Sequence, residues 1–167
     1  MEMSEPRLRK RIISPSPVPT GERQTGALDI PALATILVTS EDPAHPVDHL
    51  FARPGGKTGR GWVAAEPGEQ YLIVEFDQPQ ELRVIAIEIA EEERARSQEL
   101  TISISTDGGT TYREILRQEF NFSPPGTIYE RENWTVAESG VTNLCVRIVP
   151  DKQGGQGRAS LAALMIR

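Results

Sequence analysis

Apolar and polar residues alternate with a period of two in four separate segments of the chain. In an extended strand this alternation puts the apolar side chains on one face, so each segment can bury one side. Isoleucine and valine are frequent in these segments, which favours strands over helices. The pattern therefore predicts strands at residues 72–76, 85–89, 100–104 and 144–148.

Glycine, proline and aspartate punctuate these strands. The clearest turn is Asp-Gly-Gly at 107–109, because glycine accepts the positive φ angles of a tight hairpin. No segment has a sustained helical period, and the best helix candidates are single turns at 47–51 and 91–96. Many short antiparallel strands separated by turns are typical of a sandwich or a barrel. We therefore predict an all-β fold, a jelly-roll β-sandwich of antiparallel strands, with further turns at 77–79, 124–126 and 154–155.

The 167 residues are enough for one domain with one hydrophobic core. Residues 1–26 contain four prolines and no long apolar run, so we interpret them as a flexible tail before a sandwich domain at 27–167. A first strand over residues 8–13 is the alternative. No apolar run is long enough to span a bilayer, and the N-terminus has no apolar core of a secretory signal. A cytoplasmic location without membrane contact is expected.

The net charge of −6 is unevenly distributed. Residues 1–26 carry five basic and three acidic side chains, a net +2, which leaves −8 for the rest of the chain. An acidic body does not attract a phosphate backbone over a broad surface. Nucleic-acid binding is therefore expected only through the basic cluster at 7–11, which otherwise is part of a solvated tail.

The sequence offers no recognisable catalytic arrangement. Cys145 is the single cysteine, so an internal disulfide is excluded, and its place in a predicted strand favours a buried side chain over a nucleophile. No Ser-His-Asp or Cys-His arrangement stands out, and no carboxylate pair is set apart by its context. We therefore expect a protein that is not an enzyme and needs no cofactor.

Three segments resemble the discoidin-like domains, also called coagulation factor V/VIII C-type or galactose-binding-like jelly rolls. They are VTSEDPAHPVDHLF, TGRGWVAAEPGEQYLIVEFDQPQELRVIAIEI and ELTISISTDGGTTYREI, and the likeness extends over residues 34–167. The resemblance implies that Trp62 is a buried core residue. A shorter likeness, in W-x-A-A-x-x-G-E at 62–69 and F-x-x-S-P at 120–124, is to the N-terminal domain of the scaffold protein of animal single-strand-break repair.

The resemblance implies a binding function, because these domains recognise sugars, phospholipid headgroups, nucleic acid or proteins through loops at one end. Fold analogy alone gives nothing finer. We therefore expect a non-catalytic intracellular module that engages a protein or polar ligand through its end loops. A carbohydrate-binding module is the alternative, and a DNA-repair-type scaffold domain is a further one.

The resemblance also bears on metal binding, since many discoidin-like domains hold a calcium ion. The positions where carboxylates would be expected are Ala52 and Ala163, so no metal is predicted. A zinc pair of His45 and His49, with Asp48 between them, would share a helical face. Pro46 disfavours that helix, and the alternative is a surface turn.

Two arginine-bearing segments are the best candidates for a binding site. The glycine-rich stretch 151–160 lets backbone approach a ligand, and Arg158 offers a planar fork to a carboxylate, phosphate or sugar hydroxyl. By the resemblance, this loop and the hairpin at 91–96 emerge at the same end. Our hypothesis is that the arginines and Gln156 converge on one site for an anionic or hydroxyl-rich group. The predicted ligand-binding residues are Arg94, Arg96, Gln156 and Arg158, with Asn121 and Phe122 as a further contact surface.

The remaining large aromatic residues near this region are predicted to pack in the core. These are Phe120, Tyr129 and Trp134.

Overall fold

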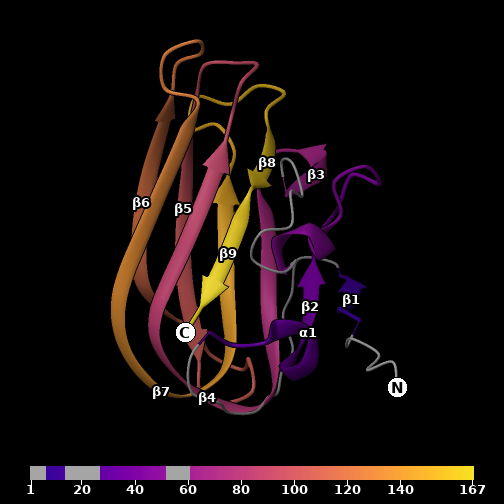
Figure 1. The fold of residues 1–167 in the computed structure, drawn as a ribbon, viewed down its shortest axis with the longest axis vertical. Helices are drawn as coiled ribbons and strands as arrows, with labels where there is room; N and C mark the ends of the chain where they lie inside the picture. Colours follow the sequence, from indigo (N-terminus) through magenta and orange to yellow (C-terminus); the bar gives the residue numbers. More distant parts are fainter. Residues whose placement is uncertain (1–6, 14–26, 52–60) are drawn as a thin grey trace, which may run out of the picture.

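The computed structural model describes residues 7–13, 27–51 and 61–167 (Figure 1). These residues form nine strands, one short α-helix and one 3₁₀-helix. The strands are β1 (Arg9–Ile12), β2 (Ala34–Val38), β3 (Trp62–Pro67), β4 (Gln70–Ala90), β5 (Arg96–Ser105), β6 (Arg113–Phe122), β7 (Tyr129–Val149), β8 (Arg158–Leu161) and β9 (Ala163–Ile166). The helix α1 (Ile30–Leu33) precedes β2, and the 3₁₀-helix η1 (Val47–Phe51) follows it.

The strands form a two-layered sandwich in which every described pairing except that of β1 with β2 is antiparallel. The main sheet has the order β1-β2-β4-β7-β5-β6, and β9 pairs with the second half of β4. A separate pair, β3 with β8, lies at one end of the sandwich. The predicted all-β antiparallel sandwich is confirmed.

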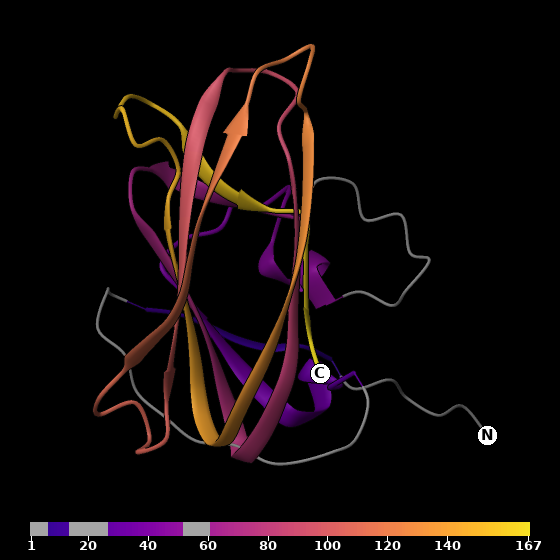
Figure 2. The same ribbon diagram turned by 90° about the vertical axis from the view of Figure 1, so that its left-hand side faces the viewer.

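Two long strands connect the layers. Both β4 and β7 have 21 residues and bend, so that the layers join at the bottom of the view in Figure 2. The predicted turn at 77–79 is wrong, because β4 continues through these residues. The pairing register of β4 with β7 shifts between Glu75 and Val84, and such irregularities bend a strand without ending it.

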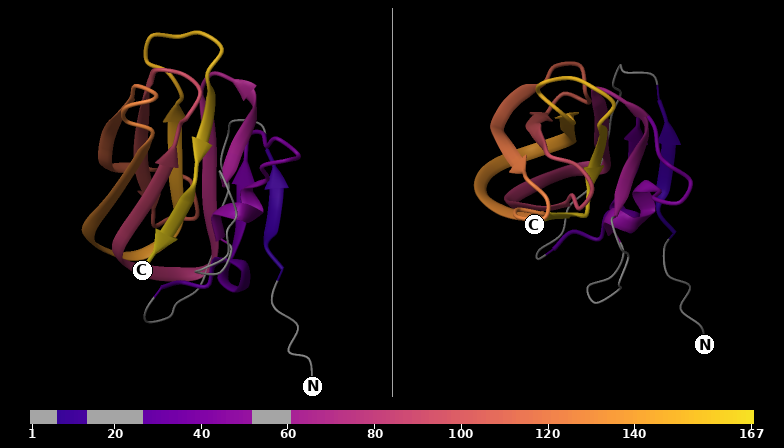
Figure 3. Two further views of the ribbon diagram at one scale, coloured as in Figure 1. Left: turned by 45° about the horizontal axis from the view of Figure 1, so that its top comes forward. Right: turned by 90° about the horizontal axis from the view of Figure 1, so that it is seen from above.

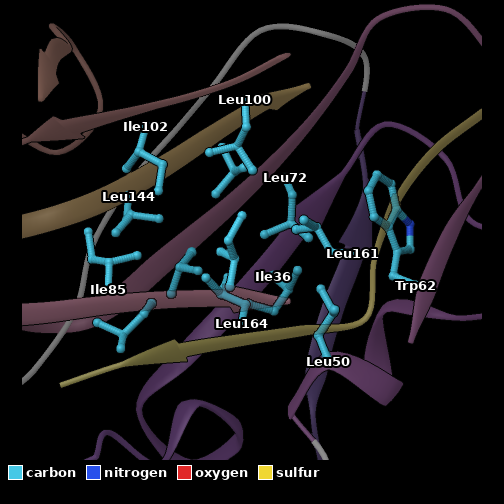
Figure 4. Close-up of a cluster of buried hydrophobic side chains, with 14 of the residues drawn as sticks. Ile36, Leu50, Trp62, Leu72, Ile85, Leu100, Ile102, Leu144, Leu161 and Leu164 are labelled. Atoms are coloured by element: carbon cyan, nitrogen blue, oxygen red, sulfur yellow. The ribbon is translucent and has the colours of Figure 1, made fainter. Parts of the chain in front are cut away.

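The inward faces of the strands form one continuous core (Figure 4). The alternation in the sequence identifies these faces correctly, since the apolar positions of all four predicted strands are at most 2% exposed. Trp62 is fully buried, as the resemblance implied. The core positions confirmed in this way are Leu72, Val74, Phe76, Ile85, Ile87, Ile89, Leu100, Ile102, Ile104, Leu144, Val146 and Ile148.

Of the predicted hairpin turn and two single helical turns, the structure contains two and lacks one. The hairpin turn is confirmed, with Gly108 and Gly109 at φ values of 75° and 84° between β5 and β6. The single helical turn at Val47–Phe51 is present as η1, whereas residues 91–95 are a loop rather than a helical turn. The position that follows this loop, Arg96, is buried and begins β5, which the charged stretch did not indicate.

The N-terminal segment contains an added edge strand. Residues 9–12, which the sequence division placed in a tail, pair in parallel with β2, so the alternative of a first strand is the arrangement observed. Its basic side chains form ion pairs with carboxylates of the body. These pairs are Arg9 with Asp77, Lys10 with Glu41 and Asp48, and Arg11 with Glu75.

Cys145 should be unreactive in the folded protein. Its side chain is buried in β7, and this burial raises the pKa of the thiol to about 12. Because the thiolate is the reactive form, we expect a disulfide reagent at pH 8 to label the protein only after urea unfolds it. Complete labelling of the native protein as fast as of the unfolded protein would contradict this placement.

Candidate functional site

Loops gather at one end of the sandwich, at the top of Figure 1. They are residues 91–95 between β4 and β5, 123–128 between β6 and β7, and 150–157 between β7 and β8. The segment 39–46 lies beside β3, where Asp42 N donates to Val63 O at 2.8 Å. Figure 3 shows these loops from above. We call this region the loop end, and it contains every residue predicted to bind a ligand.

Arg96 has a buried structural position in the loop end. Its side chain is 2% exposed, and Nε donates to Glu91 Oε1 at 2.7 Å. Nη1 donates to Gln98 Oε1 at 2.6 Å and to Pro150 O at 2.9 Å, while Nη2 donates to Ser160 Oγ at 2.9 Å. Four of the five guanidinium protons therefore have protein partners. Arg96 ties the 91–95 loop to the 150–157 loop and β8, so its direct contact with a ligand stays a prediction.

Phe122 and Asn121 lie next to this buried group but differ in exposure. Phe122 is 3% exposed, and its ring centroid lies 5.8 Å from the guanidinium carbon of Arg96. That distance is within the range of a cation–π interaction. Asn121 is exposed and accepts a hydrogen bond from Ser97 Oγ. Of this pair, only Asn121 presents its side chain to solvent.

The other aromatic residues of this region are not uniformly buried. Phe120 is 3% exposed, and Trp134 is half-buried against the core. The packing prediction for Tyr129 is wrong, because its side chain is 49% exposed at the start of β7 and its hydroxyl bonds Glu88. Tyr129 faces outward because it pairs with Ala90 at the loop end, on the solvent face of the layer.

Arg158 forms an exposed ion pair across β3. Its side chain is 44% exposed, and Nη1 donates to Asp42 Oδ2 at 2.9 Å and to Ala64 O at 3.3 Å. Asp42 Oδ1 accepts from Ala44 N at 2.8 Å, and these hydrogen bonds lower the pKa of Asp42. Nε and Nη2 of Arg158 donate no hydrogen bond to the described residues. The Asp42–Arg158 pair thus offers donors that have no partner among the described residues, beside a charged carboxylate.

The structure does not give the predicted arginines a common partner. Arg94 and Gln156 are exposed on loops and form no hydrogen bond within the described ranges. The Arg96 side chain donates inward to Ser160, whereas the Arg158 side chain donates to Asp42. One ligand contacting all four residues stays a prediction. Asp42 was not anticipated, because it is 116 residues away from Arg158 in the chain.

Metal ligands are not clustered in the described part of the chain, where no group of three histidine, cysteine, aspartate or glutamate side chains could hold an ion. Ala163 lies in β9, and Ala52 lies outside the described residues. His45 belongs to a turn that bridges to Asp42, and His49 belongs to η1.

Among the described helices, none combines the length and the apolar character that crossing a membrane requires.

Because Ala52 and Ala163 stand where the resemblance places carboxylate ligands, we expect that calcium does not stabilise the protein. A specific ion at 100 times its dissociation constant would add about 2.7 kcal/mol to the free energy of unfolding. We expect the same melting temperature with millimolar calcium and with a chelator, as measured by calorimetry. A rise with calcium that the chelator reverses would show a site that this interpretation misses.

A rigid sandwich that presents exposed polar groups on loops at one end is the architecture of a jelly-roll binding module. A family model of the F5/8 type C domain matches residues 35–164. The chain therefore belongs to the F5/8 type C domain family, and it is a non-catalytic binding module. No curated protein was found to match the chain.

Solved structures with the same fold include several carbohydrate-binding modules. The family 32 module of Clostridium perfringens NanJ in complex with galactose has a TM-score of 0.59 and 16% identity, over 84% of this chain and 96% of that one. Another Clostridium perfringens module, in complex with GalNAc-β-1,3-galactose, has a TM-score of 0.57 and 18% identity, over 84% and 99%. The module of AlyQ in complex with 4,5-unsaturated mannuronic acid has a TM-score of 0.55 and 14% identity, over 79% and 92%.

Proposed function

We propose that this chain is a carbohydrate-binding module that engages a glycan through its loop end. Family membership and the sugar-bound relatives of the fold support this alternative over a protein partner. The identities are low, so the proposal depends on the chemistry of this chain's own loops.

The Asp42–Arg158 pair is the observation that carries the proposal. A sugar hydroxyl both donates and accepts hydrogen bonds, so it is well matched by a carboxylate next to a guanidinium group. The ion pair holds both groups in place before a ligand arrives. The Nε and Nη2 donors of Arg158, which bond no described residue, belong to a side chain that is 44% exposed. The side chain of Gln156, two residues before Arg158, would add an amide to the same site.

Tyr129 supports a sugar ligand in a second way. Sugars pack the C–H groups of one face against apolar and aromatic side chains, and binding sites commonly combine such surfaces with a few polar groups. The exposed ring of Tyr129 and the neighbouring Ile128, which is 36% exposed, supply an apolar surface at the loop end.

A nucleic-acid scaffold has weaker support. The basic strand β1 is the expected contact for phosphate, yet each of its three basic residues already pairs with a carboxylate of the body. Bound phosphate would have to replace those ion pairs, in a chain whose net charge is −6.

A glycan array tests the proposal directly. We expect the full chain to be retained by at least one class of glycan and the Asp42→Asn variant to lose that signal. Asparagine keeps an oxygen that can accept from Ala44 N but removes the carboxylate charge. An array that retains neither protein would contradict the carbohydrate function and favour a protein partner.

A further inference from the structure

A hollow of about 510 Å³ opens at the end of β1. It lies close to the Asp42–Arg158 pair, since Ser40 in its wall accepts from Ala65 N, while Arg158 donates to Ala64 O of the same peptide group. Its volume lies within the roughly 300–1,000 Å³ of small-molecule sites. Ile12 and Ile13, which form part of its wall, precede the residues 35–164 that match the family model. The lining residues are Ile12, Ile13, Thr39, Ser40, Glu66, Glu69 and Gln70.

Hydrogen bonds fix the orientation of the Gln70 amide beside this hollow. Ser40 Oγ accepts from Ala65 N at 3.0 Å and from Glu66 N at 3.4 Å, which uses both of its lone pairs. The hydroxyl proton of Ser40 must then point to Gln70, whose oxygen Oε1 lies 2.8 Å away. Thr39 Oγ1 also donates to this oxygen, at 2.6 Å. The amide oxygen is therefore fully engaged, and Nε2 points elsewhere.

The Nε2 group of Gln70 is a donor without a partner in the described part of the chain. Gln70 is only 5% exposed, but its Nε2 keeps some access to solvent, which it can reach through the hollow that Gln70 lines. A ligand that displaces water from the hollow would have to supply an acceptor in its place, because donors taken out of water are usually satisfied. An acceptor atom supplied by a ligand in the hollow would satisfy it.

Two carboxylates at the hollow differ in charge balance. Glu69 Oε1 accepts from Tyr71 OH at 2.7 Å and pairs with Arg147, and these contacts lower the pKa of Glu69. The Glu66 carboxylate forms no hydrogen bond or ion pair within the described ranges. Glu66 can therefore accept from a ligand, whereas the charge of Glu69 is already compensated.

We propose that this hollow is a second binding site, which takes one sugar unit beside the Asp42–Arg158 pair. A hydroxyl group can accept from Gln70 Nε2 and another can donate to Glu66, while the carbon skeleton packs on Ile12 and Ile13. An organic ammonium ion would pair with Glu66 but brings no acceptor for Gln70. The ligand class follows the proposed function, but the location does not depend on it.

The Gln70 side-chain NH₂ signal of the ¹⁵N-labelled full chain tests the proposal by NMR. Gln70→Glu identifies this signal, since it removes the NH₂ group and keeps acceptor oxygens for Ser40 and Thr39. The probes are galactose, glucose and N-acetylgalactosamine, with methylammonium as the competing class. We expect at least one sugar to shift the signal in a saturable way.

Variants test whether the sugar occupies the hollow. Glu66→Gln removes a charged acceptor and should weaken the titrated affinity about tenfold or more, the effect of one hydrogen bond to a charged group. Ile12→Ser removes an exposed apolar side chain from the wall and should also weaken the affinity. The matched control Met165→Ser alters an exposed apolar side chain of β9 that does not line the hollow, and it should leave the affinity unchanged.

Three results would overturn the second site: no shift with any of the sugars, a shift with methylammonium alone, or an unchanged affinity in both Glu66→Gln and Ile12→Ser. If the hollow fails while the array signal persists and depends on Asp42, the proposed function stands without it. If the array fails while Gln70 responds, the second site stands alone.

Discussion

Replacing Arg96 with alanine should lower the free energy of unfolding by about 3–5 kcal/mol, the usual cost of breaking a buried charge pair. The substitution leaves the Glu91 carboxylate, which is 13% exposed, without its cation. It also removes the guanidinium groups that donate to Gln98 Oε1 and to Ser160 Oγ. Gln98 is fully buried, and Ser160 is 7% exposed. Both groups then lose hydrogen bonds in a place that water barely reaches.

Urea denaturation measures this loss as a lower transition midpoint with an unchanged slope. Arg94→Ala is the matched control, because Arg94 lies on the same loop, is exposed and bonds no described residue. Its free energy of unfolding should stay within about 0.5 kcal/mol of the original chain. An Arg96→Ala variant as stable as Arg94→Ala would show that the Arg96 contacts do not hold the loop end together.

Replacing Trp62 with alanine should cost a similar amount, about 3–5 kcal/mol, because a fully buried indole leaves a large cavity. The indole also donates from Nε1 to Ser40 O at 3.0 Å, which links the start of β3 to the segment that carries Asp42. Trp62→Phe keeps most of the apolar volume but leaves the Ser40 carbonyl without this donor. Its free energy of unfolding should therefore lie between those of the original chain and Trp62→Ala.

Thermal unfolding of the two Trp62 variants checks this order. Trp134→Phe is the control. Because Trp134 is half-buried, the same change there should lower the melting temperature less. Equal melting temperatures for Trp62→Phe and the original chain would mean that the Ser40 hydrogen bond contributes nothing to stability.

The core of the fold could be predicted because burial of one strand face imposes a period of two on the sequence. This is why the apolar positions of β4, β5 and β7 are correct. The extent of the strands could not be predicted, since β4 crosses its bend through register shifts rather than a turn, and Asp77-Gln78-Pro79 is typical of a turn. β1 has exposed side chains throughout, so no apolar alternation favoured this strand over a tail, and a first strand was predicted only as the alternative.

The candidate site was predictable only in part. The glycine-rich stretch directed attention to Arg158, which begins β8 and is exposed at the loop end. Its partner Asp42 comes close only because β3 pairs with β8, a contact between distant parts of the chain. Arg96 and Arg94 belong to the same charge-rich stretch, and the sequence does not show which of them turns inward.

Isothermal titration calorimetry with the glycan that the array retains tests the central claim, that the loop end binds carbohydrate. Arg158→Ala should weaken the affinity about 10–150-fold, which corresponds to the roughly 1.5–3 kcal/mol of hydrogen bonds to a charged group. Arg83→Ala is the matched control: Arg83 is 78% exposed and pairs with Glu81 at 3.8 Å, near the bend of β4. The account predicts an unchanged affinity for Arg83→Ala, and an Arg158→Ala variant that binds as tightly as the original chain would contradict it.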